Sequence, residues 1–65
     1  MNGMKVAAMI DKLRDDGWVV VAIRGSHRQF RHPTKPGKVT VAGKASDDLH
    51  PKTEASIIWQ ARLRR

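Results

Sequence analysis

One histidine stands where residue type and spacing could support acid–base chemistry. His27 follows a Gly-Ser pair and lies between Arg24 and Arg31. An imidazole has an unperturbed pKa of about 6.5, so it can take or give a proton near neutral pH. RNA carries its own nucleophile, the 2′-hydroxyl, so a general base and cations on the phosphate are sufficient to cleave it. Phosphodiester cleavage is therefore one hypothesis for His27, and a role in binding alone is the other.

A tight hairpin must position this histidine. Glycine comes first in the pair Gly25-Ser26, as a type II′ turn requires, because that position has a positive φ. Ser26 is then a turn residue, with an orienting role toward substrate as the alternative. The hairpin predicts these cross-strand pairs: Arg24 with His27, Ala22 with Gln29, Val21 with Phe30, and Val20 with Arg31.

Opposed residues share a face of a sheet, and faces alternate along each strand. The alternation predicts one open face that carries Arg24, His27, Gln29 and Arg31. It predicts one core face that carries Val19, Val21, Ile23 and Phe30. Trp18 falls on the parity of the open face, where packing at the strand's start is favoured over stacking on a base.

Two helices and a third strand complete the pattern. Apolar residues at i, i+3, i+4 and i+7 predict a helix over residues 4–16, which Gly17 ends. The predicted strands are 18–24, 27–32 and 38–42, with Val39 and Val41 facing inward and a loop at 33–37. A second helix begins at His50-Pro51 or at Thr53. Its buried side includes Ile57, Ile58 and Ala61, with Trp59 left open.

This order predicts an α+β fold: helix, three-stranded antiparallel sheet, helix. Both helices must cover the same sheet face, since each has a single apolar stripe to bury. At 65 residues, the chain is expected to form one domain, 1–65, with a frayed start at residues 1–3.

Charge is distributed unevenly along the chain. The formal net charge is +7, and no acidic residue lies between Gly17 and Ser46. That stretch contains six cations: Arg24, Arg28, Arg31, Lys35, Lys38 and Lys44. Such a segment favours a polyanion, so the expected partner is a nucleic acid or an acidic protein.

Other classes of site are disfavoured. The chain has no cysteine, which excludes a disulfide scaffold and thiolate metal ligands. His27 and His32 lie five apart on one predicted strand and point to opposite faces, so no metal or other cofactor is expected. His32 is predicted to pack at the end of its strand, and His50 to begin a helix. No apolar run approaches the ~18 residues of a membrane span, so a cytoplasmic protein is expected.

Taken together, these motifs resemble a known family. The amphipathic helix 4–16 is followed by Gly17-Trp18, Gly25-Ser26-His27, Phe30 and His32-Pro33. In this order they resemble the HicA toxins of bacterial HicA–HicB toxin–antitoxin systems. The resemblance implies a fold like a double-stranded-RNA-binding domain and the activity of an mRNA interferase. The family's catalytic histidine falls on His27, and a HicB antitoxin is implied as the partner that covers it.

One departure from the family pattern concerns the segment after the third strand. Many HicA proteins have a proline there and a histidine two places on, whereas this chain has Ala42 and Lys44. Lys44 could replace the positive charge of that histidine but not its other roles.

The leading hypothesis is therefore a metal-independent endoribonuclease toxin that cleaves mRNA with His27 as general base or acid. The candidate substrate-binding residues are Arg24, Ser26, Gln29, Arg31 and Lys44. The alternatives are a non-catalytic RNA-binding module of the same fold, and a protein whose basic surface binds an acidic partner.

Overall fold

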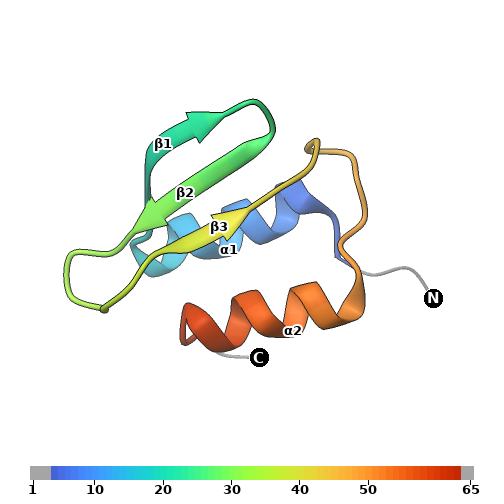
Figure 1. Cartoon of the computed structure of the whole chain (residues 1–65). Coiled ribbons are helices and arrows are strands. Elements are labelled where there is room, and N and C mark those ends of the chain that lie inside the picture. The colour runs from blue at the N-terminus through green and yellow to red at the C-terminus, as the bar shows by residue number, and fades with distance from the viewer. Residues whose placement is uncertain (1–3, 64–65) are drawn as a thin grey trace.

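Two helices pack against one face of a three-stranded sheet in the computed structural model, which describes residues 4–63 (Figure 1). The elements are α1 (Val6–Asp16), β1 (Val19–Arg24), β2 (His27–Arg31), β3 (Val39–Val41) and α2 (Pro51–Gln60). The sheet is an antiparallel meander in the order β1-β2-β3. The predicted α+β fold is confirmed, while the predicted frayed start at 1–3 lies outside these residues.

Gly17 ends α1 as predicted. Its φ is 107°, its amide donates to the carbonyl of Arg14 at 3.0 Å, and the amide of Trp18 donates to Leu13 at 2.9 Å. These two bonds form a Schellman motif, in which the last helical carbonyls receive partners. A Cβ at position 17 would lie 2.8 Å from Nε2 of His32. Both the backbone conformation and the packing therefore require glycine.

His50 begins α2. Its Nδ1 accepts a hydrogen bond from the amide of Lys52 at 3.1 Å, and Pro51 occupies the first helical turn. The start at His50-Pro51 is therefore the correct one of the two predicted alternatives. At the other end Arg62 takes a φ of 52°, and the amide of Leu63 donates to Ile58 at 3.0 Å.

The core lies between the two helices and one face of the sheet. Its buried members are Val6, Met9, Leu13, Trp18, Phe30, Val39, Val41, Leu49, Ile57 and Ala61. Both helices thus cover the face that carries Phe30, as predicted. The packing role of Trp18 is confirmed, since only 1% of it is exposed. Trp59, which the sequence left open, is 81% exposed.

The register of β1 differs from the prediction beyond its midpoint. Arg24 opposes His27 and Ala22 opposes Gln29, as expected, but Val20 opposes Phe30 and Val19 opposes Arg31. The predicted pairs Val21–Phe30 and Val20–Arg31 are therefore wrong. The cause is an irregularity between Val20 and Ala22, a β-bulge that places one extra residue in β1.

The predicted core face of β1 is also wrong. Val19, Val21 and Ile23 are 58%, 56% and 63% exposed. Because the bulge shifts the alternation, Val20 is the β1 residue that packs against the core. The helices bury the aliphatic residues of β3 and leave most of the edge strand β1 in solvent (Figure 1).

Candidate functional site

The Gly25–Ser26 turn places His27 at the start of β2. Gly25 has a φ of 57° and Ser26 does not have a positive φ, so the predicted type II′ geometry is confirmed. The turn sets Arg24 directly opposite His27 across the hairpin, and both side chains are exposed. An imidazole and a guanidinium therefore stand on the same sheet face, next to solvent.

Lys44 reaches the same end of the sheet from a different segment. Nη1 of Arg28 donates to the carbonyl of Gly43 at 2.8 Å and to the carbonyl of Ser26 at 3.4 Å. The residues that follow these two carbonyls are Lys44 and His27. Figure 1 shows the same neighbourhood, with the β1–β2 turn beside the connection from β3 to α2. The structure thus brings the backbone next to Lys44 to the end of the sheet that carries Arg24, Ser26 and His27.

Gln29 and Arg31 lie farther along the strand. They alternate with Phe30 and so share the face of His27; Gln29 pairs with Ala22 and Thr40. At about 3.4 Å per residue, Arg31 is roughly 14 Å along β2 from His27. The candidate residues of β2 thus extend along one face of the sheet from His27 to Arg31.

The imidazole of His27 has no fixed orientation from neighbouring groups. Within residues 4–63, it takes part in no hydrogen bond or ion pair. The same part of the chain contains no group of three His, Cys, Asp or Glu side chains arranged to hold a metal ion. In the loop after β3, the amide of Lys44 donates to the Asp47 carboxylate at 2.9 Å, which sets a negative charge in this otherwise basic region.

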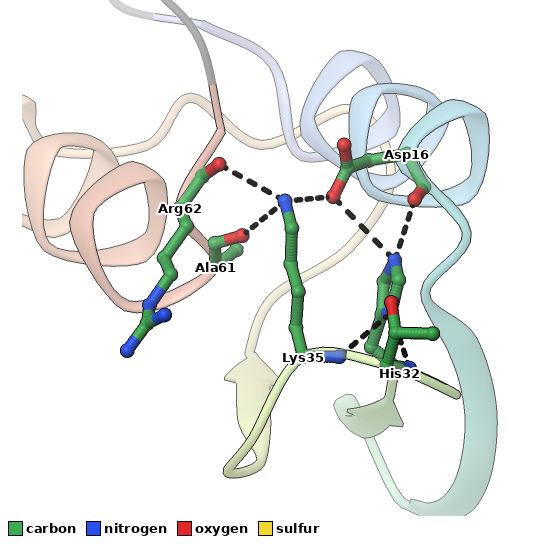
Figure 2. Close-up of polar contacts among 6 residues, drawn as sticks. Asp16, His32, Lys35, Ala61 and Arg62 are labelled. Carbon is green, nitrogen blue, oxygen red and sulfur yellow. Dashed lines mark hydrogen bonds and ion pairs between the residues drawn. The ribbon is translucent and has the colours of Figure 1, made fainter.

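His32, directly after the end of β2, has a structural role at the opposite end of the sheet. Nε2 of His32 donates to the carbonyl of Asp16 at 2.6 Å. Its Nδ1 accepts from the amides of Thr34 and Lys35, both at 3.1 Å (Figure 2). The ring lies edge-on to Trp18, with centroids 5.3 Å apart. The predicted packing role of His32 is confirmed, as is the role of His50 at the start of α2.

Lys35 is engaged within the fold rather than free on the surface. Its Nζ donates to Oδ2 of Asp16 at 2.5 Å and to the carbonyls of Ala61 and Arg62 at 3.2 and 3.0 Å (Figure 2). The hydrogen bond from Lys35 lowers the pKa of the Asp16 carboxyl below its ordinary value of 3.8. Lys35 thus ties the ends of both helices together, and its charge contributes little to a nucleic-acid surface.

Two residues with clear roles were not singled out by the sequence. Arg28 alternates into the same face of β2 as Phe30, so a charged side chain stands on the core-facing side. That placement was a signal that its guanidinium needs hydrogen-bond acceptors inside the fold. Lys35 offered no such signal, since its partners lie 19 and 26 residues away along the chain.

Comparison with known proteins bears on the identity of the chain. No helix in the part that the structure describes has the length and apolar character to cross a membrane. No curated protein matches the sequence. A family model described as "HicA toxin of bacterial toxin-antitoxin" matches residues 7–63, a range that includes Gly25-Ser26-His27 and nearly all of the fold. The chain therefore belongs to the HicA toxin family, as its motifs predicted.

Proposed function

We propose that this HicA chain is an endoribonuclease that cleaves mRNA and that His27 is its general base. The observation that carries the proposal is the pairing of exposed His27 with exposed Arg24 at one end of the sheet, with the backbone that leads into Lys44 close to the same turn. Membership of a toxin family supports the same conclusion. An acid–base group flanked by two cations matches the needs of RNA cleavage by its own 2′-hydroxyl.

The reaction follows from the chemistry of these groups. His27 takes the proton of the 2′-hydroxyl, and the 2′-oxygen forms a bond to the adjacent phosphorus. The bond from phosphorus to the 5′-oxygen breaks, and that oxygen takes a proton from the imidazolium or from water. The products are a 2′,3′-cyclic phosphate and a free 5′-hydroxyl. Negative charge that develops on the phosphate oxygens is stabilised by the cations beside it.

The candidate binding residues divide by position. Arg24 lies directly opposite His27, and Lys44 follows Gly43 beside the turn, so these two side chains serve the reacting phosphate. Ser26 is exposed in the turn and is available to orient the ribose or phosphate. Arg31, with Gln29 between it and His27, serves a neighbouring phosphate of the same strand.

The natural partner in this proposal is a HicB antitoxin that covers His27, and both proteins act in the cytoplasm. The net charge of +7 suits an acidic inhibitor as well as an RNA substrate. Family membership supports the pairing of toxin and antitoxin.

A non-catalytic RNA-binding module is the second candidate. It is favoured by the lack of any group that orients the His27 imidazole among residues 4–63. In this case the cations bind phosphates and His27 adds a modest contact.

A comparison of His27→Ala with His50→Ser tests the proposal. His50→Ser also removes a histidine, but serine keeps the N-cap of α2. Purified proteins are incubated with mRNA, and cleavage, cyclic-phosphate ends and RNA affinity are measured. We expect His27→Ala to lose about 10²–10⁴-fold in cleavage rate while RNA affinity changes little, and His50→Ser to cleave normally.

Cleavage that persists in His27→Ala at the wild-type rate would contradict the role of His27. RNA binding without cleavage by the wild-type protein would favour the second candidate. In bacteria the same variants report on toxicity, because only His27→Ala should relieve growth arrest and loss of transcripts.

A further inference from the structure

Arg28 connects two segments that the strand ladders leave unpaired. Its Nη1 donates to the carbonyl of Gly43 at 2.8 Å and to that of Ser26 at 3.4 Å. Arg28 itself opposes Val41, the last residue of β3. The chain before β2 and the chain after β3 therefore run side by side past the end of the sheet, and one guanidinium nitrogen binds a carbonyl from each.

This guanidinium does not face the open side of the sheet. Arg28 alternates with His27 and shares the parity of Phe30, whose side chain is fully buried. Its side chain is half-buried at the rim of the core, where a charged group needs hydrogen-bond acceptors. The two carbonyls supply them. Arg28 is thus directed away from the surface on which RNA would lie.

The two segments differ in how else they are held. The loop after β3 is fixed to the start of α1, since the amides of Val6 and Ala7 donate to Asp47 and Ala45 at 2.9 and 3.0 Å. The hairpin turn has no such anchor: Arg28 makes the one side-chain hydrogen bond to Gly25 or Ser26 found within residues 4–63. Arg28 is therefore the side chain that fixes the turn relative to the loop.

We propose that Arg28 is a positioning residue that holds His27 and Lys44 at the separation needed to act on one phosphodiester. The carbonyls it binds belong to Ser26 and Gly43, the residues immediately before His27 and Lys44. Without the guanidinium, the turn moves relative to the loop and the two side chains lose their alignment. This inference rests on the proposed ribonuclease function.

A double-mutant cycle separates this role from others. Arg28→Met keeps an apolar stem of similar length and removes the donors, and Lys44→Ala removes the proposed partner. We expect each single variant to lower kcat on RNA by roughly 10–100-fold, since small misplacements at an active site have effects of this size. The double variant should fall no more than about 3-fold below the worse single variant, because residues that act together are not additive. Losses that multiply would overturn the proposal.

The salt dependence of RNA binding tests whether Arg28 contacts RNA directly. The salt dependence of RNA affinity should be the same for Arg28→Met and for Arg14→Ala, a control that removes an equal charge from α1. A slope that falls by about one in Arg28→Met alone would indicate a phosphate contact and would overturn the proposal. Arg28→Lys should recover part of kcat, since an ammonium can still donate to a carbonyl.

A structural measurement tests the role of Arg28 without relying on RNA cleavage. Nuclear Overhauser contacts between residues 25–27 and residues 43–44 are compared in the wild type and in Arg28→Met. We expect their loss in the variant, with core contacts such as Phe30 to Val39 retained. Contacts that stay unchanged would overturn the proposal. If the wild type does not cleave RNA, the proposed function fails, while this comparison still shows whether Arg28 holds the two segments together.

Discussion

Two histidines, one at the start of β2 and one directly after its end, have contrasting surroundings. His27 is exposed and makes no hydrogen bond with the rest of residues 4–63, whereas the His32 side chain is only 9% exposed and uses both ring nitrogens. Because Nδ1 of His32 accepts hydrogen bonds from two backbone amides, the neutral imidazole carries its proton on Nε2. A fully engaged imidazole has no capacity left for catalysis, while a free one does.

These environments predict a contrast in stability. His32→Ala should lower the free energy of unfolding by about 2–4 kcal/mol, because it leaves the carbonyl of Asp16 and two loop amides without their partner. His27→Ala should change it by less than about 0.5 kcal/mol, since an exposed side chain without contacts is lost. Urea denaturation followed by the fluorescence of Trp18 and Trp59 measures both. Equal losses would show that His32 is not the structural histidine.

At the scale of elements, local patterns predicted most of the fold. The 3.6-residue period of Val6, Met9 and Leu13 identified α1, and glycine at positions 17 and 25 identified the helix end and the turn type. These signals depend on a few neighbouring residues, so no distant contact is needed to interpret them. The pairing of Arg24 with His27, and with it the centre of the candidate site, followed from the turn alone.

The same reasoning failed where the outcome depends on distant elements. Alternation places Ile23 on the face of Phe30, but it does not show how far along that face the helices reach, and Ile23 is exposed. The extra residue at the bulge then reverses the pattern for Val19 and Val20. Arg28 and Lys44 could not be placed together from sequence either. Their proximity arises beyond the ends of the strands, where the pairing rules no longer apply.

Substitutions in β1 and β3 test the observed faces. Ile23→Thr should change the free energy of unfolding by less than about 0.5 kcal/mol, because Ile23 is 63% exposed. Val41→Thr should lower it by about 1–3 kcal/mol, since it places a hydroxyl in a fully buried position. Both replacements keep a β-branched side chain, so strand propensity is matched. Thermal unfolding measures the difference, and a larger loss for Ile23→Thr would contradict the observed burial.

At the scale of the whole molecule, Lys35 joins parts that are far apart in sequence. From the loop between β2 and β3, its ammonium binds the Asp16 carboxylate at the end of α1 and the carbonyls of Ala61 and Arg62 just after α2 (Figure 2). A cation there also complements the negative ends of both helix dipoles. The loop and the two helix ends are thus held by one ammonium group.

This arrangement predicts a loss of stability in acid. The hydrogen bond from Lys35 lowers the pKa of Asp16 in the folded state, so the folded protein binds this proton less readily than the unfolded chain does. The stabilisation is therefore complete above pH ~4 and is lost as the pH falls through the lowered pKa. Asp16→Asn should be less stable at neutral pH and should lose less stability between about pH 4 and 2. Melting temperatures of the wild type and of Asp16→Asn across this pH range measure the difference. Parallel curves for the two proteins would contradict the role of Asp16.

The open edge of β1 links solubility to ionic strength. The strand has a hydrogen-bonded neighbour on one side and exposes three aliphatic side chains, so it can pair with a copy of itself. Mutual repulsion between chains of charge +7 opposes that encounter, and dissolved salt screens it. Added salt therefore lowers the barrier to self-association, so the free protein should become less soluble as ionic strength rises.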